Sequence, residues 1–249
     1  MHIPFDLALV AAIAVFLLAG MVKGLIGMGL PTIAMGLLAV IMPPAQAAAI
    51  LIVPSFVTNV WQLAAGPAFA GLVRRLWSMM AGVIVGTITG SGVLAGNSAG
   101  IATAGLGAAL ILYGLVSLSG VRFTTPSRHE AWLSPLIGAA TGLVTGATGV
   151  FVIPAVPYLQ SLGLEKDDLI QALGLSFTVS TVALAAGLLR VEAFQPGLAG
   201  LSLLALIPAL AGMFVGQWIR SRISAETFRS VFFVGLLTLG GYLLIRALL

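Results

Sequence analysis

The sequence predicts an all-α, polytopic membrane protein with an inverted internal repeat. Each half is expected to begin with a glycine-broken helical hairpin and to continue with three transmembrane helices. Hydrophobic residues make up 60% of the 249 residues and charged residues only 7%, whereas about 25% charged residues are typical of soluble domains. Apolar runs near the ~20 residues of a spanning helix recur along the chain. Two glycine-rich interruptions, "GMVKGLIGMGLP" and "GLVTGATGVFVIP", fall inside longer apolar stretches.

Six uninterrupted apolar runs each have a length near that of a spanning helix. They cover residues 45–66, 76–95, 98–120, 168–189, 197–219 and 228–248. Two further stretches, 5–42 and 131–163, are long enough for two passes each but are interrupted in the middle. We interpret them as broken hairpins, which either cross the membrane fully or re-enter it. The start of the chain, "MHIPFDLALV", lacks the basic region of a signal peptide, so we expect the first stretch to be retained.

The two halves of the chain resemble each other in sequence. The interruptions align at an offset of 122, and each is followed by a proline, Pro31 or Pro154. Downstream, "SFVTNVWQLAAG" and "SFTVSTVALAAG" align at an offset of 121. The paired glycines are Gly20, Gly24 and Gly27 with Gly142, Gly146 and Gly149, and, more weakly, Gly86 and Gly90 with Gly212 and Gly216. We infer a duplication, with repeats at 1–120 and 131–249 joined by a cytoplasmic linker at 121–130.

The number of crossings predicts how the two halves are oriented. An interrupted pair returns the chain to its starting side, so each half crosses an odd number of times and the second half is inverted. Basic residues support this topology through the positive-inside rule, because eight fall on one side and two, Arg190 and Arg246, on the other. The eight are Arg74, Arg75, Arg122, Arg128, Lys166, Arg220, Arg222 and Arg229. An alternative topology with eight simple spans places six of these ten basic residues on one side and four on the other. We therefore expect both termini outside.

A backbone break within the membrane predicts a cavity there. An unpaired amide in hydrocarbon costs several kcal/mol, so irregular chain is tolerated only inside protein or beside water. Glycine permits such a break, and Pro31 and Pro154 suit the start of the helix that follows. That helix start carries free N–H groups and partial positive charge, which favour an anion. By contrast, we expect the glycines of "GLGAALILYG" and "GVIVGTITG" to serve helix packing.

The candidate binding residues lie in the interruptions and on the helix after each hairpin. Lys23 is the only charge in the first interruption. It either faces an anion or extends to the cytoplasmic interface, and both interpretations stay open. Asn59 and Gln62 share a helix face and are costly to bury unpaired. The candidate substrate-binding residues are Lys23, Gly24, Gly27, Met28, Gly29, Asn59, Gln62, Thr145, Gly146, Thr148, Gly149, Val150, Phe151, Ser176 and Ser180.

Composition argues against several other functions. The chain has no cysteine, and its histidines, His2 and His129, lie at the terminus and in a predicted loop, so we expect no metal site and no cofactor. The basic residues form no stripe for nucleic acid. A membrane-embedded enzyme needs converging catalytic groups, and the sequence shows none. Acidic residues fall in predicted loops or near a helix end, which disfavours coupling through a buried carboxylate, whereas sodium coupling through carbonyls and hydroxyls stays open.

At these residues the sequence resembles the sulfite exporter TauE/SafE family, also called the toluene sulfonate uptake permease family. The resemblance covers essentially the whole chain and rests on the two glycine-rich segments closed by proline, Gly24–Pro31 and Gly146–Pro154. Val150 and Phe151 depart from the pattern, because glycines are frequent there in the family. The resemblance implies a transporter of sulfite, sulfonates or related small anions in the bacterial inner membrane, with lipid and the anion as its partners.

Export is the direction that the residues favour. A monoanion that leaves a cell with a negative interior gains ~2.3 kcal/mol per 100 mV without a coupling ion. We therefore expect export of sulfite or an organosulfonate by alternating access, with the anion between the two hairpin tips. Two alternatives stay open. One is an ion-coupled uptake carrier for an organic anion, and the other is a non-transporting membrane subunit of a larger complex.

Overall fold

The computed structural model describes residues 5–96, 99–121, 123–193, 196–220, 222 and 225–249. His2, Arg122 and residue 98 of the expected helix 98–120 lie outside these ranges. The described residues form ten α-helices and no strand, which confirms the all-α prediction. The helices are α1 (Phe5–Ile26), α2 (Leu30–Ile41), α3 (Pro44–Ala64), α4 (Phe69–Ala95), α5 (Ala99–Leu118), α6 (Ser127–Thr148), α7 (Ala155–Ser161), α8 (Lys166–Arg190), α9 (Pro196–Arg220) and α10 (Ala225–Leu248).

Seven of the described helices are long and apolar enough to span a membrane, which confirms a multi-pass membrane protein. They are α1, α3, α4, α5, α8, α9 and α10. Both glycine-rich interruptions break the helical backbone, as expected: α1 is separated from α2, and α6 from α7. Within each hairpin, however, the two limbs differ in length, and the first limb is the longer one. Helices α1 and α6 each have 22 residues, or about 33 Å at ~1.5 Å per residue.

The returning limbs of the two hairpins are short. Helix α2 has 12 residues and α7 has 7, which correspond to about 18 Å and about 10 Å. Neither reaches the ~30 Å of a hydrocarbon core. Re-entrant limbs therefore stay a prediction, which these short lengths favour over full second crossings.

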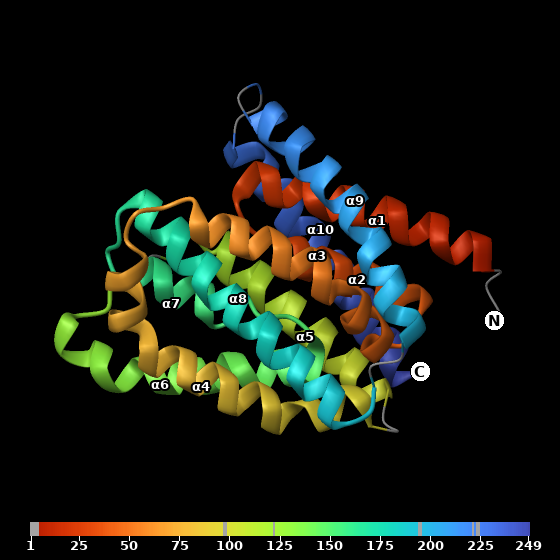
Figure 1. Cartoon of the computed structure of the whole chain (residues 1–249), viewed down its shortest axis with the longest axis horizontal. Helices are drawn as coiled ribbons and strands as arrows, with labels where there is room; N and C mark the ends of the chain where they lie inside the picture. The colour runs from red at the N-terminus through yellow and green to blue at the C-terminus, as the bar shows by residue number, and fades with distance from the viewer. Residues whose placement is uncertain (1–4, 97–98, 122, 194–195, 221, 223–224) are drawn as a thin grey trace.

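The first helix of each half packs against the other half. Helix α1 packs along α9, and α6 packs along α4, while α3 pairs with α8 and α5 with α10. Figure 1 shows the start of α1 and the end of α10 at one end of the molecule. The start of α6 and the connections from α3 to α4 and from α7 to α8 lie at the opposite end. The inverted duplication itself stays a prediction.

Glycines bring the paired helices to backbone contact. A Cβ added to Gly86 of α4 would lie 2.3 Å from the carbonyl oxygen of Ala139 in α6, and one added to Gly142 would lie 2.3 Å from that of Val83. Gly20 and Gly212 make equivalent contacts between α1 and α9. The packing role expected for "GVIVGTITG" is thus confirmed. Four glycines that the alignment places in the interruptions, Gly20, Gly24, Gly142 and Gly146, lie inside α1 and α6 and pack against neighbouring helices.

Two helices, α4 and α6, begin furthest before the expected positions. Helix α4 starts at Phe69 instead of residue 76, and α6 starts at Ser127, within the expected linker 121–130. A bidentate ion pair joins these extensions, because Arg75 Nε and Nη2 donate to the Glu130 carboxylate at 2.6 and 2.8 Å. A charged residue marks the end of an apolar run in the sequence, but the helix can continue past it into the polar interface of the membrane.

Candidate functional site

The first break lies between α1 and α2. Gly27 and Gly29 have φ angles of 79° and 104°, a left-handed region that favours glycine. The amides of Met28, Gly29 and Leu30 donate no hydrogen bond within the described chain. The hydroxyl of Thr32, in the first turn of α2, is fully buried and has no partner there either. The start of α2 therefore offers several unused donors, together with the positive end of the helix dipole.

The second break, between α6 and α7, is longer and more tightly packed. Gly149 has a φ angle of 74°, and the Ile153–Pro154 peptide bond is cis. Val150 and Phe151 are fully buried. The amide of Val150 donates to Thr148 Oγ1 at 3.2 Å, whereas those of Phe151, Val152 and Ile153 donate to no other described residue. Phe151 packs on Phe177 of α8 with ring centroids 5.2 Å apart.

Both breaks lie along helix α2. Gly29 is its N-cap residue, and Gly149 lies against the side chain of Met35 in the same helix, where an added Cβ would meet Met35 Cε at 2.7 Å. Six residues separate Gly29 from Met35, which is about 9 Å along a helix axis. The fold thus brings the two hairpin tips close together, although their glycines are more than a hundred residues apart in sequence.

Lys23 lies one turn before the first break and is buried, with 4% of its surface exposed. Its Nζ donates to Asn59 Oδ1 of α3. The Asn59 amide nitrogen donates in turn to Ser55 Oγ at 3.1 Å and to Thr181 Oγ1 of α8 at 3.4 Å. Among the described residues, no carboxylate is in ion-pair contact with Lys23. The structure thus places the lysine inside the bundle and not at the interface.

Further buried polar atoms near this cluster along α3 and α8 have no partner. The hydroxyls of Ser176 and Ser180 lie on one face of α8, which packs against α3, and neither forms a hydrogen bond within the described chain. Gln62 of α3 donates through Nε2 to the Ile170 carbonyl at 3.0 Å, but its Oε1 is unpaired. Buried polar groups are normally satisfied, so these atoms are candidate partners for a polar ligand or water.

A cavity of about 860 Å³ leads from one end of the molecule to the first break. We call this end the arginine-rich end, because Arg220 and Arg229 line the cavity there and Arg75 contacts the carbonyl oxygen of Leu162 nearby. The inner wall of the cavity includes Met28 and Tyr113. The Tyr113 hydroxyl donates to Met28 Sδ at 3.0 Å. Lys23 does not line the cavity.

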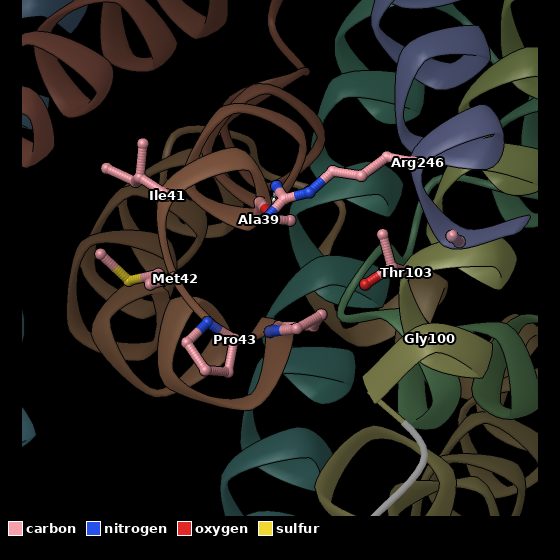
Figure 2. Close-up of a pocket in the computed structure, with 9 residues that line it drawn as sticks. Ala39, Ile41, Met42, Pro43, Gly100, Thr103 and Arg246 are labelled. Carbon is pink, nitrogen blue, oxygen red and sulfur yellow. Dashed lines mark hydrogen bonds between the residues drawn. The ribbon is translucent and has the colours of Figure 1, made fainter. Parts of the chain in front are cut away.

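A smaller pocket of about 340 Å³ lies at the end of α2. Figure 2 shows the Arg246 side chain extending from α10 toward Ala39 of α2, with Gly100 and Thr103 of α5 beside it. Arg246 Nη1 donates to the carbonyl oxygens of Ala39 at 3.3 Å and Val40 at 2.6 Å. These are among the last carbonyls of α2, where a cation is favoured.

The structure brings most of the predicted site residues around α2 and α3. Lys23 and Asn59 are in direct contact, and Gly27, Met28, Gly29 and Gly149 form the two breaks. Gly24 and Gly146 face backbone atoms of neighbouring helices, so their contact with a substrate stays a prediction. Thr145 and Thr148 donate to carbonyls of their own helix, at 2.7 and 2.6 Å.

Several residues of this region were missing from the predicted set. Ser55 and Thr181 join the Lys23 cluster, and Arg220, Arg229 and Tyr113 line the large cavity. The aligned "SF" segments already contain Ser55 and Thr181, and their alignment is the signal that could have found them. In the sequence, Arg220 and Arg229 indicate only which side of the membrane their loop faces. Nothing in the neighbouring sequence places them beside a cavity.

The fold and this site define a polytopic membrane protein with two backbone breaks and a buried polar cluster that contains a lysine. A comparison with protein families matches residues 12–243 to the family described as sulfite exporter TauE/SafE. The chain belongs to this family of membrane transporters, as its sequence resemblance indicated. No curated protein and no solved structure shows a significant match.

Proposed function

We propose that this chain exports small oxyanions of the sulfite and sulfonate class across the bacterial inner membrane by alternating access of two inverted halves. The arginine-rich end faces the cytoplasm, and both termini lie outside. The observation that carries this proposal is the Lys23 side chain, buried at 4% exposure with a neutral amide oxygen as its acceptor. An uncompensated cation inside a membrane protein is costly, and a transported anion is the counter-ion that such a site lacks.

The proposed binding site lies between the Lys23 cluster and the start of α2. Lys23 and Asn59 supply a charge and an amide, and the amides of Met28, Gly29 and Leu30 supply donors at a helix N-terminus. The hydroxyls of Ser176 and Ser180 supply further polar partners. An oxyanion accepts hydrogen bonds through several oxygens, so this donor-rich arrangement suits it better than a cation. The second break contributes by fixing α2 through the contact of Gly149 with Met35.

Tyr113 and Met28 separate the site from the large cavity in this conformation. We place the substrate path through this contact, because Met28 belongs both to the first break and to the cavity wall. A break with two positive-φ glycines can change its dihedral angles at low cost. In this proposal, a change of the backbone dihedral angles at the first break accompanies each transport step.

Flux measurements in proteoliposomes test this function. We expect labelled sulfite to leave vesicles faster when the membrane potential drives anions outward, and the Lys23→Met variant to lose this flux. Accumulation that requires a sodium gradient would instead favour the ion-coupled uptake carrier. Purified protein that shows neither flux nor a sulfite-dependent thermal shift would favour a non-transporting subunit. Turnover of any substrate to a new chemical species would contradict the expectation that the chain is not an enzyme.

A further inference from the structure

The large cavity carries a second anion-binding feature, separate from the Lys23 cluster. Arg220, in the last turn of α9, and Arg229, in α10, both line it at the arginine-rich end. No aspartate or glutamate lies among the described residues of its lining. Among the described residues, the arginines thus have no carboxylate partner inside the cavity. Serine hydroxyls, including those of Ser117 and Ser230, add polar groups to the same wall.

The contacts of the two arginines leave their charge directed at the cavity. Arg229 Nη2 donates at 3.4 Å to the carbonyl oxygen of Ser117, and its guanidinium lies 5.6 Å from the centre of the Phe233 ring. Both of these neighbours line the cavity too. Arg220 makes no ion pair within the described chain. Two exposed guanidinium groups that line one concave space favour the accumulation of anions there.

Arg222 provides an internal comparison. It lies two residues after Arg220 but does not line the cavity. Its guanidinium instead lies 3.7 Å from the centre of the Trp218 ring, and Trp218 is exposed on the outside of the bundle. The three arginines carry equal charge and lie close together along the chain. Arg222 differs from the other two in its position relative to the cavity and in its contact with Trp218.

We propose that Arg220 and Arg229 form a recruitment site in this cavity, at which a hydrated small oxyanion binds before it passes the Tyr113–Met28 contact. This inference rests on the proposed transport function for its ligand, but its location and residues are distinct from the Lys23 cluster. The volume of about 860 Å³ holds an anion together with many waters, since one water occupies ~30 Å³ in the liquid. An anion keeps part of its hydration here and loses it deeper in the protein.

Kinetics in vesicles of known orientation test the recruitment site. In the double variant Arg220→Gln, Arg229→Gln, we expect KM for sulfite supplied at the arginine-rich end to rise about tenfold, with the maximal rate unchanged. KM for sulfite supplied at the opposite end stays at the wild-type value. Raising the salt concentration increases the wild-type KM more than that of the double variant, because salt screens exposed charges. The control Arg222→Gln retains wild-type kinetics.

Three outcomes would overturn this inference. One is a double variant with wild-type KM, and another is an Arg222→Gln variant with an equal rise in KM. The third is a defect that appears in vesicles with anionic lipids but not in purely zwitterionic ones, since the arginines would then bind lipid headgroups instead of the free anion.

Equilibrium binding separates this inference from the proposed function. We expect purified Lys23→Met protein to keep weak binding of radiolabelled sulfite, and the added Arg220→Gln and Arg229→Gln changes to abolish it. If wild-type protein shows no flux but this binding persists, the transport proposal fails and the recruitment site stands. If flux depends on Lys23 while the residual binding is absent and KM does not respond to the arginines, the recruitment site alone fails.

Discussion

At the scale of single residues, Lys23 is a buried basic group that has no carboxylate partner among the described residues. Replacing it by methionine preserves much of the side-chain length and removes the charge. Because a hydrogen bond to a charged group contributes about 1.5–3 kcal/mol, we expect the Lys23→Met variant to bind sulfite roughly tenfold to a hundredfold more weakly. The melting temperature of the anion-free protein should not fall, because removing a poorly compensated buried charge is often neutral or stabilising.

Sulfite-dependent thermal unfolding and vesicle flux measure both effects of Lys23→Met. The matched control is Lys166→Met, since Lys166 is the only other lysine of the chain and is exposed at the start of α8. Equal sulfite affinity in the two variants would exclude Lys23 from the binding site.

Asn59 provides a complementary test, because a substitution there can supply the missing counter-ion. The Asn59→Asp variant places a carboxylate next to the Lys23 ammonium that Asn59 now contacts. An internal carboxylate competes with an external anion for the same cation. We expect flux to be largely lost while the melting temperature stays equal or rises, because the cation gains a permanent partner. Unimpaired flux in Asn59→Asp, measured beside Asn59→Gln, would argue that the ammonium never meets the substrate.

At the scale of elements, glycine contacts set the distance between paired helices. Gly86 of α4 faces the α6 backbone, whereas Gly92 of the same helix has open space around it. Overpacking a tight interface costs about 1–3 kcal/mol, so we expect Gly86→Ala to lower the melting temperature clearly. Gly92→Ala should leave it unchanged or raise it slightly, because alanine favours helix. Thermal unfolding of the two variants in one detergent compares them, and equal melting temperatures would refute the close contact.

The break before α2 can be tested through its backbone conformation alone. A Cβ at Gly27 would meet nothing within 4 Å, but the residue has a φ angle of 79°. A left-handed conformation costs an ordinary residue roughly 1–2 kcal/mol, and asparagine tolerates it better. We therefore expect Gly27→Ala to reduce stability and sulfite flux, and Gly27→Asn to retain more of both. If the alanine variant matched wild type in both measurements, the break would not need this conformation.

The elements also show what the sequence could and could not predict. Glycine clusters followed by proline correctly indicated two backbone breaks, because such residues favour irregular chain at any depth. They could not show that Gly24 and Gly146 lie inside helices, since packing glycines and turn glycines look alike in one sequence. The lengths of α2 and α7 were equally hidden, because both limbs of each hairpin are apolar. The Lys23–Asn59 contact required tertiary structure, although each residue was recognisable as an unusual polar group in an apolar run.

At the scale of the whole molecule, the proposed duplication predicts a relation between the two cavities. The larger one is lined by α7, the end of α5 and the start of α10, and the smaller one by the end of α2, the start of α5 and the end of α10. If α2 corresponds to α7 and α5 to α10, each cavity is the counterpart of the other. Their volumes differ, at about 860 and 340 Å³. The proposed alternating access predicts such a difference, because one pathway opens while its counterpart closes.

Alternating access then requires the two cavities to respond in opposite directions. The chain has no native cysteine, so single cysteines at Ser230 in the large cavity and Gly100 in the small pocket can report access to an impermeant maleimide. We expect the small pocket to open when Arg246 moves away from the α2 carbonyls. The Arg246→Gln variant, which lacks this contact, should therefore favour the conformation in which the small pocket is open and the large cavity is closed. We expect that variant to label severalfold faster at position 100 and more slowly at position 230, by the arithmetic of population shifts. Toluenesulfonate can serve as the anion in this assay because it does not react with thiols. Its addition should change the labelling rates at positions 100 and 230 in opposite directions as well. Rates that rise or fall together would indicate local loosening around Arg246, and the two halves would then not exchange conformations.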